Sequence, residues 1–164
     1  KQKTAYEIRL SLVGSEMCIR DSYHGEIVKL SIDYNQKINM VAISSNDIIE
    51  YPQDSPERMK ELWNSLNLSF PYLFDETQQI AKKYKAECTP EFYLFNHQNK
   101  LEYRGRMDET SPGSDKLPSG KDLRMAIDNL LSNQPICKEQ LPSMGCNIKW
   151  EIGEEPDYFL NVKG

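Results

Sequence analysis

Hydrophobic residues recur every three to four positions in several stretches of the chain, a period that predicts amphipathic helices. Residues 23–37 have the pattern of the last turns of such a helix, with Ile27, Leu30 and Tyr34 on its apolar face. The other predicted helices and their apolar faces are 56–66 (Met59, Leu62, Trp63, Leu66), 76–85 (Ile80, Ala81, Tyr84) and 119–131 (Leu123, Ala126, Ile127, Leu130, Leu131).

Polar residues mark where two of these helices begin. Ser55 suits the N-cap position and Pro56 the first helical position. Asp75 and Gln78 resemble a capping box, in which Asp75 caps the helix and Gln78 reaches back toward it. The sequence therefore predicts helix starts close to residues 56 and 76.

Short apolar runs predict a buried sheet. Residues 38–43 and 92–95 are apolar almost throughout, which suits strands that are covered on both faces. The turn 97–99 joins 92–95 to a further strand at 101–104, and so short a connection requires an antiparallel pair. A parallel section followed by a hairpin is therefore expected.

Two stretches lack periodicity. Residues 107–118 are rich in Ser, Pro, Gly and Asp and predict an exposed loop. Residues 135–164 contain Pro135, Pro142 and Pro156 and predict a tail packed on the domain rather than a second domain. The domain itself is expected to span 23–134.

Composition narrows the classes of partner. The chain carries a net charge of −5, which offers no surface for a polyanion, so nucleic acid is not expected as a partner. No apolar run reaches the length that spans a membrane, and no secretory signal is visible. The four cysteines form no CxxC pair and no zinc spacing, so neither metal nor cofactor is expected. Reduced thiols in a cytoplasmic protein are the default expectation.

The most suggestive chemistry lies just before the strand 92–95. Pro90 cannot donate to a ladder and so belongs at a strand's start, and the Thr89–Pro90 bond is of the kind that can be cis. Cys88 precedes this proline by two residues. It is either a redox-active thiol that takes part in exchange or a buried small apolar side chain.

Other candidate residues carry weaker signals. Cys146 is either a resolving cysteine that folds back onto the domain or a free surface thiol, and Cys137 is expected at the surface. Asn46 lies at the carboxyl end of the strand 38–43, where ligands gather in open sheets, and either orients the active-site loop or caps a turn. Arg104 and Arg106 share a strand face and either bind an anion or the loop residue Asp108, or are solvated.

The first 22 residues resemble a translated sequencing-library adapter. Residues 1–8 and 12–22 match its two constant segments, KQKTAYEI and LVGSEMCIRDS, and residues 9–11 stand where a variable index would be. We therefore expect 1–22 to be an artefact, and Cys18 is assigned no function. The alternative is a genuine segment in which 7–13 forms an alternating strand.

Residues 23–150 resemble a thioredoxin-like family of the alkyl hydroperoxide reductase and thiol-specific antioxidant superfamily. The segments that carry the resemblance are AISSND (42–47), YPQDSPE (51–57), FPYLFDETQ (70–78), CTPEF (88–92), YRGR (103–106) and PSMGCNIKW (142–150). The resemblance implies a thioredoxin-like α/β fold, a mixed sheet with flanking helices. It also implies that the backbone of Thr89, before Pro90, pairs with a bound substrate chain.

In that family a CxxC at the start of the first long helix is the redox centre, where a helix N-terminus lowers a thiol pKa. Tyr23 aligns a few residues beyond it. The chain is therefore expected to lack both the redox pair and the native central strand, between 38–43 and 92–95. Residues 23–164 alone are expected to be marginally stable.

These observations lead to two functional hypotheses. The first is a thiol–disulfide oxidoreductase or peroxiredoxin-like antioxidant that acts on a disulfide or peroxide with a thiol reductant. Its substrate would contact Thr89, Pro90 and Asn46, with Cys88 or Cys146 as accessory catalytic thiols. The chain as it stands is expected to be inactive because the redox pair is missing. The alternative is a non-catalytic thioredoxin-fold interaction module.

Overall fold

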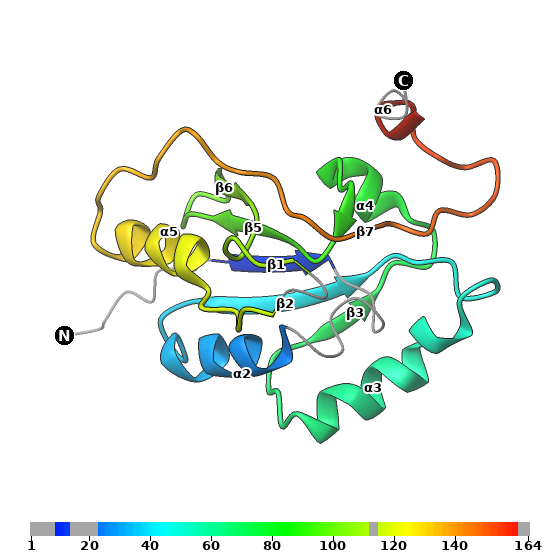
Figure 1. The fold of residues 1–164 in the computed structure, drawn as a ribbon, viewed down its shortest axis with the longest axis horizontal. Helices are drawn as coiled ribbons and strands as arrows, with labels where there is room; N and C mark the ends of the chain where they lie inside the picture. The colour runs from blue at the N-terminus through cyan, green and yellow to red at the C-terminus, as the bar shows by residue number, and fades with distance from the viewer. Residues whose placement is uncertain (1–8, 14–22, 112–114, 161–164) are drawn as a thin grey trace.

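The computed structural model describes residues 9–13, 23–111 and 115–160 of the 164-residue chain. Within that part, a five-stranded mixed sheet has the strand order β3-β2-β1-β5-β6 (Figure 1). Its strands are β1 (Arg9–Val13), β2 (Asn39–Ser44), β3 (Tyr72–Phe74), β5 (Glu91–Phe95) and β6 (Leu101–Gly105). β1, β2 and β3 are parallel, while β5 is antiparallel to both β1 and β6. The predicted parallel section and closing hairpin are both present.

β1 occupies the centre of the sheet. It pairs in parallel with β2 along all five of its residues and antiparallel with β5 along the same five. The family resemblance places the native central strand at this same position, between 38–43 and 92–95. The expectation that the native strand there is a different one, and that 1–22 is an artefact, stays a prediction.

Helices α2 (His24–Asp33) and α3 (Pro56–Ser65) follow the predicted pattern, and the 3-10 turn η1 (Pro52–Asp54), which the sequence did not predict, precedes α3. Ser55 caps α3, because its Oγ accepts a hydrogen bond from the Arg58 N–H at 3.5 Å. Met59 and Trp63 are buried on the predicted apolar face. The local signals for this helix are therefore confirmed.

Helix α4 (Gln79–Tyr84) begins later than predicted. The predicted capping box is right for Asp75 and wrong for Gln78. Asp75 does cap the helix: its Oδ2 accepts from the N–H groups of Ile80 and Ala81 at 2.9 and 3.0 Å. Gln78 does not reach back to Asp75. Its amide instead binds the C-terminal tail, donating to the Lys149 carbonyl at 2.9 Å. A buried tail competes for this side chain more effectively than a local turn.

The segment 107–118 was expected to be an exposed loop, and for Met107, Asp108 and Thr110 this is wrong, since all three are buried. Asp108 Oδ2 accepts from the N–H groups of Ser119 and Gly120 at 2.6 and 2.7 Å. The carboxylate thereby satisfies backbone groups just before helix α5 (Lys121–Leu131), which begins two residues later than predicted.

Strand β5 separates two apolar clusters. Phe92 and Leu94 belong to the larger cluster, with residues of α2 and α5, while Tyr93 belongs to the smaller one. The smaller cluster contains Ala81, Ala86, Ile148, Trp150 and Phe159, with Tyr84, Phe95 and Tyr158 packed against it. The alternation along β5 explains why this strand reads as continuously hydrophobic.

The C-terminal tail supplies one side of the smaller cluster. After α5 the chain runs past β6 to β7 (Cys146–Asn147), which pairs with β4 (Cys88–Thr89), and then forms α6 (Asp157–Leu160) (Figure 1). Ile148 and Trp150 of this segment are buried in the smaller cluster.

Candidate functional site

Thr89 and Pro90 lie where strand β4 leads into β5. The peptide bond between them is cis, and the Thr89 side chain is almost completely buried. In the antiparallel β4–β7 pair, Thr89 stands opposite Cys146 and Cys88 opposite Asn147. Thr89 Oγ1 also donates a hydrogen bond to the Cys146 carbonyl at 3.2 Å. The residue before the proline is therefore already paired with an extended segment that carries a cysteine.

Gly145 allows this close pairing. A β-carbon at this position would lie 2.8 Å from the carbonyl carbon of Thr89 and closer still to its oxygen. Because glycine has no β-carbon, it alone lets the tail main chain approach so closely. Periodicity and cysteine spacing point to Cys146 but not to Gly145, and the one signal for Gly145 is its place directly before that cysteine.

Ser143 ties the preceding part of the tail to the domain. The Cys88 thiol donates to the Ser143 carbonyl oxygen at 3.4 Å. The Ser143 hydroxyl donates to the Gly105 carbonyl at 2.8 Å, and the Arg106 N–H donates to the Leu141 carbonyl at 3.1 Å. The tail thus crosses the ends of β4 and β6 and is hydrogen-bonded to both.

Cys88 lacks the features of a reactive thiolate. Burial, followed by the charges of Glu91 and Glu87, raises the pKa of the Cys88 thiol to about 12, and Arg104 only partly opposes them. A thiol must ionise before it attacks a disulfide, so Cys88 is protonated and weakly nucleophilic at neutral pH. The geometry fits the buried apolar alternative better than the role of an exchanging thiol.

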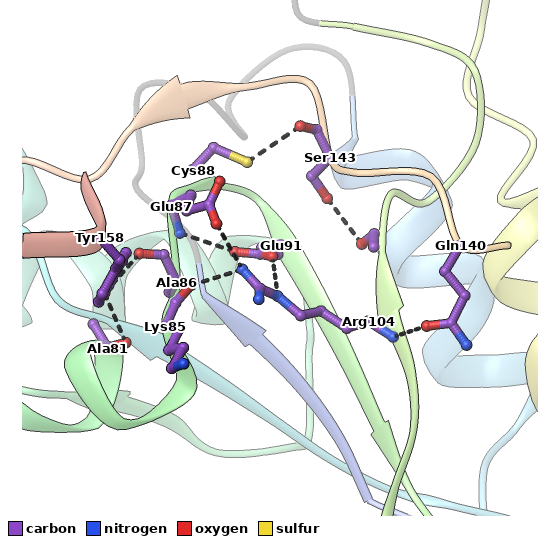
Figure 2. A network of polar contacts seen from close by, with 11 residues as sticks. Ala81, Lys85, Ala86, Glu87, Cys88, Glu91, Arg104, Gln140, Ser143 and Tyr158 are labelled. Atoms are coloured by element: carbon purple, nitrogen blue, oxygen red, sulfur yellow. Dashed lines mark hydrogen bonds and ion pairs between the residues drawn. The ribbon is translucent and has the colours of Figure 1, made fainter. Parts of the chain in front are cut away.

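Arg104 is the centre of a polar network beside Cys88 (Figure 2). Its Nε donates to Glu91 Oε1 at 2.7 Å, and its guanidinium also contacts the Lys85 carbonyl and the Glu87 carboxylate at 2.6 and 3.3 Å. The Arg104 backbone N–H donates to the side chain of Gln140 in the tail at 2.8 Å. This network holds the β4 segment and the tail against the same strand.

The expectation that Arg104 or Arg106 contacts Asp108 is wrong. Arg106 Nε pairs with Asp122 Oδ2 at 2.7 Å instead, and Arg104 pairs with Glu91. The Asp108 carboxylate instead accepts hydrogen bonds from the N–H groups of Thr110, Ser119 and Gly120 and from the Thr110 hydroxyl. Its burial would raise its pKa, but hydrogen bonds from Thr110, Gly120 and Ser119 outweigh burial and lower it. The sequence could not reveal these partners, which come from other elements.

Asn46 lies buried at the end of β2, and both polar atoms of its side chain are hydrogen-bonded. Its Nδ2 donates to Asp54 Oδ2 at 2.7 Å, and its Oδ1 accepts from the Lys149 N–H at 3.0 Å. Asn46 therefore connects η1 with the main chain of the tail just beyond β7. Any contact with a substrate would have to replace the contact with the tail.

The described cysteines differ in state and exposure. Cys88 is free and buried, Cys137 is free and exposed, and Cys146 forms a disulfide and is exposed. Cys18 lies outside the described residues. Across 9–13, 23–111 and 115–160 there is no group of three or more His, Cys, Asp or Glu side chains that could hold a metal ion.

Two small cavities border Cys88. One, of about 230 Å³, is lined by residues that include Glu91, Arg104 and Ser143. The other, of about 190 Å³, includes Met144 and Phe159. Pockets that enclose compact ligands measure about 300–1,000 Å³. A larger cavity of about 680 Å³ lies by α2 and β2, and no cysteine lines it.

Comparison with known proteins gives consistent results. A model of the AhpC/TSA family matches residues 26–104. An uncharacterized conserved protein from Geobacillus kaustophilus is 40% identical with a TM-score of 0.85, over 91% of this chain and 80% of that one. A hypothetical protein from Sinorhizobium meliloti is 36% identical with a TM-score of 0.86, over 91% and 82%.

The chain belongs to the AhpC/TSA family. The expected thioredoxin-like fold of this AhpC/TSA chain is also confirmed. A thioredoxin-like protein solved in its oxidized form superimposes with a TM-score of 0.61 at 18% identity, over 78% of this chain and 80% of that one. No curated protein matches the sequence. Among the described residues of the AhpC/TSA chain, no helix has both the length and the apolar character needed to cross a bilayer.

The structure of this AhpC/TSA chain brings three of the predicted site residues into direct contact with the tail. Cys88 and Thr89 contact it through β4, and Asn46 through Lys149. Cys146 is part of the tail itself. Cys88, Thr89 and Asn46 therefore all lie along one stretch of the tail, which carries Cys146.

Proposed function

We propose that this AhpC/TSA-family chain is the substrate-binding part of a redoxin that carries out thiol–disulfide exchange on polypeptides. The observation that carries the proposal is the pairing of Thr89, the residue before Pro90, with a cysteine-bearing strand. The narrow cavities beside Cys88 favour an extended chain over a compact ligand.

The reaction needs two cysteines. The thiolate of the first attacks one sulfur of a substrate disulfide, and the other substrate sulfur leaves as a thiolate and takes up a proton. The second cysteine then attacks the mixed disulfide. This releases the substrate as a dithiol and leaves a protein disulfide, which a thiol reductant returns to two thiols. With a peroxide, the first thiolate would instead become a sulfenic acid.

We place the attacking pair just before α2, where the family resemblance implies it. In this placement the pair would precede Tyr23, which is buried just before α2 and donates its hydroxyl to the Thr110 carbonyl at 2.7 Å. Without that pair, the chain as it stands is inactive.

Both cysteines of this reaction belong to that pair. Of the two accessory cysteines, we assign an additional exchange role to Cys146, which forms a disulfide, and a structural role to Cys88. Cys146 is exposed and stands opposite Thr89, whereas the Cys88 thiol is buried and its pKa is raised to about 12. We place the protein in the cytoplasm, where Cys88 and Cys137 would stay free thiols and the Cys146 disulfide would be a transient product of exchange.

A non-catalytic interaction module is the second candidate. The observation that favours it is the raised pKa of Cys88, since the buried thiol nearest Pro90 is not a nucleophile at neutral pH. In this case the β4 surface would bind polypeptides without exchange.

The decisive experiment compares the 164-residue chain with a longer form whose N-terminus is recovered from the upstream DNA. Each is assayed for reduction of a model disulfide and for peroxide consumption, with dithiothreitol as reductant. We expect disulfide reduction by the longer form alone, and slower but not abolished turnover in its Cys146→Ser variant. Inactivity of the longer form in both assays would favour the interaction module, and activity with peroxide alone would exclude disulfide exchange.

A further inference from the structure

The tail segment 143–151 is held by main-chain hydrogen bonds, by the buried side chains of Ile148 and Trp150, and by the disulfide of Cys146. Domain groups bind the carbonyls of Ser143, Cys146 and Lys149 and the N–H groups of Ile148, Lys149 and Glu151. The donors and acceptors on the domain are Cys88 Sγ, Thr89 Oγ1, the Asp47 N–H, the Glu87 carbonyl and the side-chain amides of Asn46 and Gln78. Main-chain contacts recognise an extended segment without regard to most of its side chains.

Two buried amides form the far end of this surface. Gln78 Nε2 donates to the Lys149 carbonyl at 2.9 Å and its Oε1 accepts from the Glu151 N–H at 3.0 Å. Asn46 Oδ1 accepts from the Lys149 N–H at 3.0 Å. Asn46 and Gln78 are 3% and 2% exposed, so they are fixed in place and poised to bind a main chain.

Side chains of the tail matter at only a few positions along this surface. Position 145 must be glycine, because a β-carbon there would overlap the Thr89 carbonyl. Ile148 fills the smaller apolar cluster and is 3% exposed. In between, Cys146 and Asn147 face outward and are exposed. The surface thus fits a glycine, then two residues whose side chains it leaves exposed, and then an aliphatic residue.

We infer that the surface formed by Asn46, Gln78, Cys88 and Thr89 is a polypeptide-binding groove, and that the tail segment 143–151 is its resident occupant. The partner is an extended segment of a substrate protein with the order glycine, any residue, any residue, aliphatic residue. It binds antiparallel to β4 by taking the place of the tail. This inference rests on the proposed function, because it names the substrate class of the same site.

Displacement of the tail sets the affinity for such a partner. The tail is tethered to the groove, so it competes at a high effective concentration, and a free peptide is bound only in the fraction of molecules whose groove is open. Weakening the tail without altering the groove should therefore strengthen peptide binding in trans.

The test uses the full 164-residue chain under reducing conditions. The probe is a fluorescent peptide of residues 143–151 with serine in place of Cys146, so that no thiol chemistry takes part, and binding is followed by anisotropy. In the Gly145→Ala variant the tail should leave β4, and we expect the peptide to bind at least about tenfold more tightly than to the wild type. The Gly25→Ala variant, where a β-carbon meets nothing within 4 Å, is the matched control and should behave as the wild type.

A second peptide, in which alanine replaces Gly145, should bind no variant. If Gly145→Ala fails to fold, as judged by circular dichroism, Trp150→Ala replaces it, because that change weakens tail anchoring and leaves the groove intact. Folded variants that bind neither peptide, or bind both equally, would overturn the inference. If the longer form exchanges disulfides but does not bind the peptide, the groove is excluded and the proposed function stands. If it binds the peptide but does not exchange disulfides, the groove stands and the proposed function is excluded.

Discussion

Arg104 Nε and Glu91 Oε1 lie 2.7 Å apart beside the buried thiol of Cys88. The Glu91 side chain is 5% exposed and that of Arg104 is 31% exposed. The buried carboxylate therefore depends on Arg104 to offset the cost of burying its charge. The pair joins β5 to β6 and, through the other contacts of Arg104, holds the segment that leads into β4. The groove proposed above therefore rests on an ion pair within the domain.

Replacing Arg104 by alanine should destabilise the protein strongly, because it leaves Glu91 buried and unpaired. We expect a loss of roughly 2–3 kcal/mol in the free energy of unfolding, measured by urea denaturation. Arg58→Ala is the control, since the Arg58–Glu61 pair is exposed on both sides and should contribute less than about 1 kcal/mol. Equal losses in the two variants would contradict this role of Arg104.

Asp108 should make stability depend on acid pH. Its pKa is lowered in the folded chain, because hydrogen bonds from Thr110, Gly120 and Ser119 outweigh burial. Its contribution is therefore fully present above the unfolded pKa of about 3.9 and is lost as the pH falls toward the folded value. We expect Asp108→Asn to lose about 1–3 kcal/mol at pH 7 and to flatten the acid limb of the stability curve.

The control for Asp108 is Asp115→Asn, at an exposed position. Its urea midpoints between pH 2 and 7 should follow those of the wild type. If Asp108→Asn also follows the wild type below pH 4, the carboxylate does not carry the expected linkage.

Cys88 should react slowly with alkylating reagents. With its pKa raised to about 12, chiefly by burial, its thiolate is scarce at pH 8. We expect iodoacetamide to label exposed Cys137 at least about a hundredfold faster than Cys88 in the native protein, as followed by mass spectrometry. Labelling of both residues at similar rates would show that Cys88 is not protected in this way.

The same thiol predicts a loss of stability at alkaline pH. Because the folded pKa of Cys88 is raised, its contribution is complete below the ordinary thiol pKa of about 8.5 and declines as the pH rises toward 12. Burial also raises the pKa values of Tyr34, Tyr103 and Tyr158 to about 12, so these groups act in the same direction. The Cys88→Ala variant should show a shallower alkaline decline than the wild type, and an unchanged slope would rule out the thiol as its source.

Asn46 should control how firmly the tail is held. Asn46→Ala removes the acceptor for the Lys149 N–H and the donor to Asp54. We expect faster hydrogen exchange in 147–151 and a loss of about 1–3 kcal/mol in stability, because buried partners remain unsatisfied. Asn64→Ala, at an exposed position of α3, is the control and should leave exchange in the tail unchanged. Unchanged exchange in Asn46→Ala would mean that the tail is held by other contacts.

Periodicity and capping residues sufficed to predict most of the elements. Ser55 and Pro56 marked the start of α3, and the turn at 97–99 required the antiparallel β5–β6 pair. These features depend on residues within a few positions of one another, so the local sequence determines them. The family resemblance also led to the thioredoxin-like fold.

Only the tertiary structure decided which groups meet at the site. Gln78 was expected to close a local capping box, yet its amide binds Lys149 and Glu151, more than seventy positions away. Thr89 faces Cys146 in the same way, and no periodic pattern links positions so far apart. Such contacts depend on the path of the whole chain, because burial and main-chain pairing in the folded state outweigh local preferences. The sequence by itself determined most of the helices and strands and identified Cys88, close to Pro90, as a candidate site residue. Only the folded chain decided that the C-terminal tail lies across Cys88 and Thr89.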